Sequence, residues 1–240
     1  MILPKAIILD LDDTILDSGD PDVAWRTVCG DVATNVQGVT PGSLYAAVIA
    51  TRDWFWDSNQ RAREGRLDLV EARRTIFLEA FSRLGVLDVA PDIVDAMANR
   101  YTALRDEAVT PFPDALQALA RLRSTGVELA LLTNGSAEKQ REKIDRFDLE
   151  VLFDYVQVEG ELGVGKPEPR SFESVLDALG VAPADAWMVG DNLLSDIQGA
   201  QRVGIYAVWI DAHGTGMAED ETVEPDRIIR SLVELVDQVP

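Results

Sequence analysis

Short runs of hydrophobic residues alternate along much of this chain with longer segments in which hydrophobic residues recur at helical spacing. Runs typical of buried parallel strands lie at Ala6 to Leu9, Val127 to Leu132, Tyr155 to Val158, Trp187 to Val189 and Tyr206 to Ile210. Between the later runs, the pattern predicts helices at Pro113 to Ser124, Ala137 to Phe147, Pro169 to Leu179 and Leu194 to Val203. Strands that alternate with helices predict an α/β fold with a three-layer parallel sheet.

The segment that follows the first run has a different pattern, with helical periodicity and no convincing strand. It predicts helices at Asp22 to Val36, Ser43 to Trp56, Leu69 to Leu84 and Pro91 to Asp106. An insertion after the first strand can cover the carboxyl end of the sheet, where open α/β sheets bind ligands. We therefore expect a Rossmann-like core of residues 1–16 and 109–240, and an all-helical cap of residues 17–108 that sets substrate specificity.

Composition and charge narrow the choice of function. The 240 residues are 47% hydrophobic, enough for a packed core, and 42 acidic against 22 basic residues give a formal net charge of -20. That charge would repel a nucleic-acid backbone and an anionic membrane, so we expect neither as a partner. The short apolar run at the N-terminus is unlike a signal peptide or a membrane span, and we expect a soluble, cytoplasmic protein. Cys29 is the only cysteine, which excludes an internal disulfide and favours a buried structural role.

Carboxylates follow the first predicted strand directly. Asp10, Asp12 and Asp13 come after Ile7 and Ile8, and residues two apart in extended chain point the same way, so Asp10 and Asp12 can face one site. Paired carboxylates suit a reaction in which one attacks and the other transfers protons. A solvated turn after a strand explains the same pattern about equally well.

Polar residues also follow the later strands. Thr133 ends one apolar run, and its hydroxyl, with nearby backbone amides, can hold a phosphoryl oxygen or can simply cap a helix. Lys166 lies between Gly165 and Pro167, and these stiff flanks favour a positioned cation over a solvated surface lysine. After another run come Asp191 and Asp196, which suit a hard cation, although Asp196 also fits an acidic helix start.

Together these motifs resemble the haloacid dehalogenase-like hydrolase superfamily, in its phosphatase branch with a C1-type helical cap. DLDDT at 10–14, Thr133, Lys166 and GDNLLSD at 190–196 occupy every position of that family's pattern, in its order. The resemblance implies that Asp10 attacks phosphorus to give an aspartyl-phosphate, while Asp12 protonates the leaving group and then activates water. It implies Mg²⁺ as the cofactor and a small phosphorylated metabolite as the substrate, either a sugar phosphate or a nucleoside monophosphate.

The resemblance also assigns the remaining site residues. Asp10, the backbone carbonyl of Asp12, and Asp191 would hold the metal. Asp196 would support the metal's ligands or Lys166, and Asn192 would lie with it around those ligands. Thr133, which would hold the phosphoryl group, and Lys166 join Asp10 and Asp12 as catalytic residues, and Thr14, Asn134 and Gly135 would bind substrate. The sole histidine, His213, is not needed for this chemistry.

Alternatives remain within and outside this family. A phosphomutase of the beta-phosphoglucomutase type would keep all these residues, whereas 2-haloacid dehalogenases lack the second aspartate, which Asp12 supplies here. A non-catalytic binding module on the same fold is less favoured because every motif position is filled. The segments 133–144, 163–172 and 188–200 look most like the subgroup of N-acylneuraminate-9-phosphatase and the pyrimidine nucleotidases. In the cap, the aromatic run 54–56 with Arg61, Arg63 and Arg66 could line a substrate pocket or form cap core.

Overall fold

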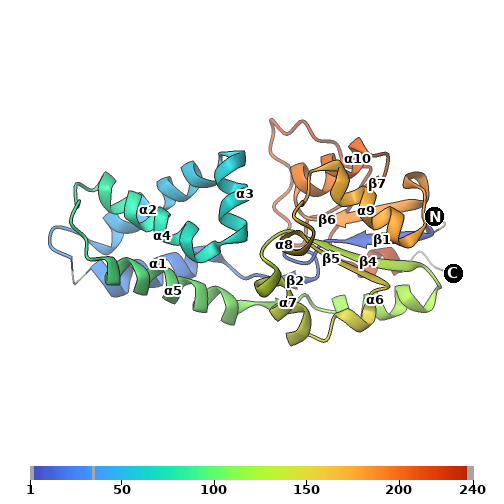
Figure 1. The fold of residues 1–240 in the computed structure, drawn as a ribbon, viewed down its shortest axis with the longest axis horizontal. Coiled ribbons are helices and arrows are strands. Elements are labelled where there is room, and N and C mark those ends of the chain that lie inside the picture. Colours follow the sequence, from blue (N-terminus) through green and yellow to red (C-terminus); the bar gives the residue numbers. More distant parts are fainter. Residues whose placement is uncertain (1–2, 34–35, 237–240) are drawn as a thin grey trace. The chain divides into compact units, whose positions relative to one another are not determined.

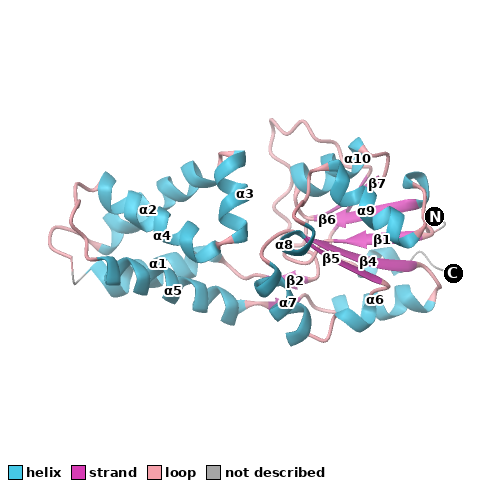
Figure 2. Cartoon of the chain, in the orientation of Figure 1, coloured by secondary structure: helices cyan, strands magenta, loops and turns pink. Residues whose placement is uncertain are grey.

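The structure, a computed structural model, describes residues 3–33 and 36–236. It divides into two compact units, one formed by the chain up to Asp17 together with the chain from Thr110 onward, the other by Ser18–Val109 (Figure 1). The first unit contains strands between helices, and the described part of the second contains helices as its only regular elements (Figure 2).

A six-stranded parallel sheet forms the centre of the first unit. Its strand order is β5-β4-β1-β6-β7-β8. The bounds are β1 Ala6–Leu9, β4 Glu128–Thr133, β5 Tyr155–Val158, β6 Ala186–Gly190, β7 Tyr206–Ile210 and β8 Arg227–Ile229. Leu9 of β1 lies opposite Leu131 of β4 on one side and Val189 of β6 on the other. The carboxyl ends of these three strands therefore meet at one edge of the sheet.

Helices cover both faces of this sheet. In Figure 1, α9 (Pro169–Leu179) and α10 (Gly199–Arg202) lie above it, and α6 (Ala115–Ser124) and α7 (Ala137–Arg146) lie below it. On the upper face, Ile8 and Met188 pack with Phe172 of α9 and Ala200 of α10 in one buried cluster. The strands are hydrophobic on both faces because each face is covered. The predicted three-layer α/β fold is confirmed.

The chain leaves the first unit and returns to it through two paired strands. Here β2 (Leu16–Asp17) runs antiparallel to β3 (Thr110–Pro111), with Leu16 opposite Pro111. An insertion of any length can begin and end at such a pair because its two ends are already held side by side. The other short elements of the unit are η1 Glu150–Leu152, α8 Glu159–Leu162, η2 Pro183–Asp185 and α11 Val233–Val236.

One predicted helix of the first unit is wrong in type. The segment expected as a single α-helix from Leu194 to Val203 is a π-helix, η3 (Leu193–Gln198), followed by the short α10. The Asn192 side chain caps η3, since its Oδ1 accepts from the backbone N–H groups of Leu194 and Ser195 at 3.1 and 2.9 Å. π-helical turns are rare and occur often at functional sites.

The second unit is a set of helices: α1 Pro21–Ala33, α2 Pro41–Trp56, α3 Asn59–Leu67, α4 Leu69–Arg83 and α5 Pro91–Ala108. Four of them lie where periodicity predicted helices, although the first was extended to Val36 and residues 34–35 fall outside the described chain. The fifth, α3, was not predicted because its sequence, NQRAREGRL, is almost entirely polar. Ser58 starts it by accepting from the backbone N–H of Arg61.

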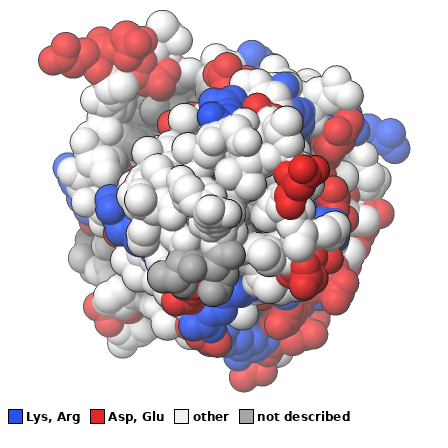
Figure 3. All heavy atoms as spheres, turned by 90° about the vertical axis from the view of Figure 1, so that its left-hand side faces the viewer, with Lys and Arg blue, Asp and Glu red and all other residues white. Residues whose placement is uncertain are grey.

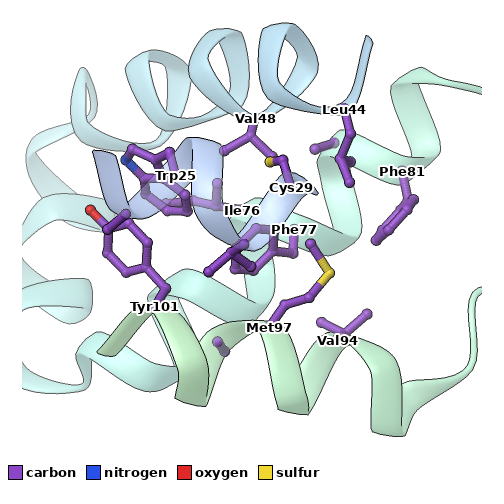
Figure 4. Close-up of a cluster of buried hydrophobic side chains, with 14 of the residues drawn as sticks. Trp25, Cys29, Leu44, Val48, Ile76, Phe77, Phe81, Val94, Met97 and Tyr101 are labelled. Atoms are coloured by element: carbon purple, nitrogen blue, oxygen red, sulfur yellow. The ribbon is translucent and has the colours of Figure 1, made fainter. Parts of the chain in front are cut away.

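The second unit has its own hydrophobic core. Trp25 stacks on Tyr101, with ring centroids 3.7 Å apart, and meets the ring of Phe77 at a steep angle (Figure 4). Cys29 is fully buried in the same cluster, as predicted, and burial raises the pKa of its thiol to about 12. Phe55 is also core, which shows that the aromatic run 54–56 is at least partly structural.

The described helices include none that is long and apolar enough to cross a bilayer. Acidic and basic side chains are interspersed on the face of the molecule drawn in Figure 3.

Candidate active site

A buried ion-pair cluster lies where the central strands end. Asp10 directly follows β1, and its backbone N–H continues the ladder by donating to the carbonyl of Val189 at 2.9 Å. The Nζ of Lys166 lies 2.6 Å from Oδ1 of Asp10 and 2.8 Å from Oδ1 of Asp196. The Lys166 and Asp196 side chains are buried almost completely. The sequence motifs that supply these residues therefore meet in one place, although they are far apart along the chain.

A third carboxylate completes the cluster. One oxygen each of Asp10, Asp191 and Asp196 lies within 4.8 Å of the other two. Lys166 compensates only one of the three charges, which leaves two formal negative charges in a largely buried place. Uncompensated buried charges are costly, so these carboxyl groups either hold a proton or bind a further positive charge.

The pKa values of the cluster report the same imbalance. Burial raises the pKa of Asp10 to about 7; Lys166 opposes this rise, and the charge of Asp196 adds to it. Burial likewise raises the pKa of Asp191 to about 9, followed in size by the repulsion from Asp10 and Asp196. For Lys166, burial disfavours the charged form, but Asp10 and Asp196 outweigh it and raise the pKa. The lysine therefore stays charged, whereas Asp10 and Asp191 lose their protons at a higher pH than ordinary carboxyl groups do.

The donor set fits a hard divalent cation. Carboxylate oxygens are the ligands that Mg²⁺ prefers, and a charge of two would balance the two uncompensated negative charges. Both oxygens of Asp196 are engaged, Oδ1 with Lys166 and Oδ2 with the backbone N–H of Asn192 at 3.0 Å. Asp10 pairs with Lys166 through Oδ1, so its other oxygen and the carboxylate of Asp191 are available for a metal. The cluster thus suits Mg²⁺, with Asp196 acting on Lys166.

Asp12 is held by two residues that the sequence motifs did not identify. Lys143 Nζ lies 2.7 and 2.9 Å from the two carboxylate oxygens of Asp12, and Gln140 Nε2 donates to Asp12 Oδ2 at 3.0 Å. Both residues lie on α7, three positions apart, and therefore on one helix face. The only sequence signal was their helical spacing after Thr133.

The loop after β4 is fixed by contacts with two other motifs. Asn134 Nδ2 donates to the carbonyl of Lys166, and Asn134 Oδ1 accepts from the backbone N–H of Lys166, both at 2.8 Å. The N–H of Gly135 donates to Oε2 of Glu159 at 3.0 Å. Asn134 and Gly135 were expected to bind substrate, and this stays a prediction; in the structure the Asn134 amide and the Gly135 N–H bond to the protein itself. Glu159, buried at the end of β5, was missed, although it stands at a strand end as Asp10 does.

Two other expected residues differ in their relation to the cluster. Thr14 is fully buried, its hydroxyl has no hydrogen-bond partner among the described residues, and it lines a separate hollow with Phe112 and Leu232. Asn192 reaches Asp196 through its backbone N–H, while its side chain caps η3. His213 lies beside Phe112, with ring centroids 5.6 Å apart.

The end of β6 requires glycine. A Cβ added at Gly190 would lie 2.3 Å from Oδ2 of Asp196. We expect Gly190→Ala to lower the free energy of unfolding by about 1–3 kcal/mol, as overpacking does, because Asp196 cannot move without leaving Lys166. Urea unfolding measures this, with Gly30→Ala in α1 as the control, since its added Cβ meets nothing within 4 Å. Equal stability of the two variants would contradict the close approach.

Comparisons with known proteins give the chain its family. Residues 4–204 match the family described as haloacid dehalogenase-like hydrolase. The chain is 39% identical to human N-acylneuraminate-9-phosphatase over 232 residues, which cover 96% of this chain and 92% of that protein. It is 40% identical to a phosphoserine phosphatase of Thermus thermophilus over 165 residues, 68% of this chain, and spans 63% of that relative's length.

A solved structure agrees on the fold. The magnesium-bound HAD hydrolase YfnB of Bacillus subtilis superposes with a TM-score of 0.73 at 21% identity, over 98% of both chains. The family match and the human relative confirm the resemblance seen in the motifs. The chain belongs to the haloacid dehalogenase-like hydrolase family.

Proposed function

We propose that this protein is a Mg²⁺-dependent phosphomonoesterase that works through an aspartyl-phosphate on Asp10. The observation that carries the proposal is the cluster of Asp10, Asp191 and Asp196 around Lys166, with Asp12 two residues after Asp10. A phosphate monoester is an anion that a carboxylate can attack only if its charge is offset. Lys166 supplies one positive charge beside Asp10. Mg²⁺ held by Asp10, Asp191 and the backbone carbonyl of Asp12 would supply the remaining positive charge.

The first chemical step divides the work between two carboxyl groups. An oxygen of Asp10 attacks phosphorus, and the bond between phosphorus and the ester oxygen breaks. The leaving alkoxide takes the proton of the Asp12 carboxyl and departs as an alcohol. Asp10 is then an acyl phosphate, and Asp12 is a carboxylate.

The second step restores the enzyme. The Asp12 carboxylate takes a proton from water, whose oxygen attacks phosphorus and breaks the bond to Asp10. Inorganic phosphate leaves, Asp10 is a carboxylate again and Asp12 is again protonated. Through both steps Thr133 and Lys166 would hold the phosphoryl oxygens, and Asp196 would keep Lys166 beside Asp10.

The substrate proposed is a small phosphorylated metabolite. Named relatives act on phosphoserine and on an acylneuraminate 9-phosphate, both small phosphate esters. The unit Ser18–Val109 is proposed as the cap that selects among such esters. Trp54 and Trp56 expose about two-fifths of their surface there, 41% and 38%, and Arg61 lies 4.0 Å from the ring of Trp54, so aromatic and cationic groups are available for contact.

Phosphate release from a panel of esters tests this function. The panel comprises phosphoserine, N-acetylneuraminate 9-phosphate, sugar phosphates and nucleoside monophosphates, each with Mg²⁺ and with EDTA. We expect release that needs Mg²⁺ and is fastest with one class of ester. Conversion of a sugar phosphate into its isomer without net release would instead indicate a phosphomutase, and chloride release from 2-chloropropionate a dehalogenase.

A further inference from the structure

Helix α7 presents two side chains to Asp12 from one face. Gln140 and Lys143 are three positions apart, and both contact the Asp12 carboxylate, which lies on the loop after β1. Lys143 reaches both oxygens, so the carboxylate cannot rotate without breaking a contact. The pairing joins residues more than a hundred positions apart in the chain, which local helix geometry does not supply.

We propose that Lys143 and Gln140 are positioning residues that hold the Asp12 carboxyl where it can exchange protons with the leaving group and with water. This inference rests on the proposed phosphatase function and extends it. Neither residue touches the reacting phosphorus in this account. Lys143 acts through Asp12, and Gln140 acts through Asp12 and Thr133.

Gln140 fixes a wider arrangement. Its Nε2 donates to Oγ1 of Thr133 as well as to Asp12, and its Oε1 accepts from Nζ of Lys143 at 2.9 Å. The side chain is 3% exposed, and both polar atoms of its amide are engaged, so only one amide orientation satisfies the contacts. Gln140 therefore sets the distance between the proton-transferring carboxylate and the hydroxyl expected to hold the phosphoryl group.

The charge of Lys143 matters because of what surrounds Asp12. The Asp12 side chain is only 31% exposed, and a partly buried carboxylate needs a cation or hydrogen-bond donors beside it. Lys143 supplies that cation, with a side chain only 19% exposed. By contrast Lys139, on the same helix, pairs with the more exposed Glu142.

Lys143→Met tests the role of the charge. We expect it to lower kcat for an alkyl phosphate such as phosphoserine by about 10-fold to 100-fold, part of the usual gain from general acid–base catalysis. KM should change by less than about 3-fold because ground-state binding does not use Asp12. Lys143→Arg should recover much of the rate, and Lys139→Met, the matched control, should keep it. If kcat of Lys143→Met equals that of Lys139→Met, the proposal is overturned.

A double variant distinguishes a role in positioning Asp12 from an unspecific loss of activity. If Lys143 acts only through Asp12, then adding Lys143→Met to Asp12→Asn should cost less than about 2-fold beyond Asp12→Asn alone. If Lys143→Met lowers the rate of Asp12→Asn by as much as it lowers the rate of the unaltered protein, Lys143 acts on another group than Asp12.

The leaving group gives a second kinetic signature. Nitrophenolate departs without taking a proton, so the first step on p-nitrophenyl phosphate needs Asp12 little. The second step still needs Asp12 to deprotonate water. Lys143→Met should therefore release a burst of nitrophenolate, close to one equivalent per enzyme, before slow turnover. Slow release without a burst would contradict a role through Asp12.

Failure of the phosphatase assignment is a separate outcome. It would show as no phosphate release by the unaltered protein from any ester of the panel. The positioning claim is then decided by crystal structures of the unaltered protein and of Lys143→Met. The positioning claim requires that Asp12 has one conformer in the unaltered protein. In Lys143→Met, Asp12 must be displaced or have several conformers. An unmoved Asp12 in both would overturn it.

Discussion

Asp10→Asn is expected to lower the rate of phosphate release by at least about 10⁴-fold, the scale seen when an enzyme loses its nucleophile. The amide cannot form the acyl phosphate, and it also removes the charge that pairs with Lys166 at 2.6 Å. Release of inorganic phosphate from the best ester of the panel, at saturating substrate and Mg²⁺, measures the effect.

The control for this variant is Asp185→Asn. Asp185 pairs with Lys5 at the opposite end of the sheet, near the start of β1, and is well exposed. The substitution Asp185→Asn removes one carboxylate from the same unit and should leave the rate of phosphate release unchanged. A rate for Asp10→Asn within about 10-fold of the unaltered protein would mean that another group attacks phosphorus.

Removal of divalent metal should have the second largest effect. We expect EDTA to lower the rate by about 10³-fold or more, because a bound metal contributes several kcal/mol of transition-state stabilisation. The physical reason lies in the cluster, where Lys166 offsets only one of three carboxylate charges. Added Mg²⁺ in excess of the chelator should restore the rate.

A substitution at Asp191 tests the proposed metal ligands. Asp191→Asn removes one proposed ligand without touching Lys166, so half-maximal activity should require more Mg²⁺ than in the unaltered protein. An identical Mg²⁺ titration would remove Asp191 from the ligand set. Full activity in EDTA would remove the metal from the mechanism.

The core of the fold could be predicted because its strands are buried on both faces. Such strands are continuous hydrophobic runs, and the bounds of β1, β5 and β7 were predicted to the residue. The edge strand β8 was missed because it is three residues long, and its Ile228 is half exposed, so it gives no continuous run. The pair β2 and β3 is shorter still, and its pairing depends on contacts between distant segments.

The site could be predicted only as far as it follows strand ends. Asp10 and Asp191 stand where β1 and β6 end, and parallel neighbours bring their carboxyl ends together. Gln140 and Lys143 reach Asp12 through contacts between segments more than a hundred positions apart, which no local pattern reveals. The contact of the Asn134 amide with the backbone of Lys166, through both Nδ2 and Oδ1, likewise joins segments that no local pattern pairs.

The most direct test of the account is to trap the covalent intermediate. The protein is mixed with its best ester and Mg²⁺, quenched within the first turnovers and treated with borohydride, which reduces an aspartyl phosphate to homoserine. Peptide mass spectrometry then locates the reduced residue. The account predicts reduction at Asp10, absent from the sample without ester. Phosphate release with Asp10 unreduced, or reduction at another aspartate, would contradict it.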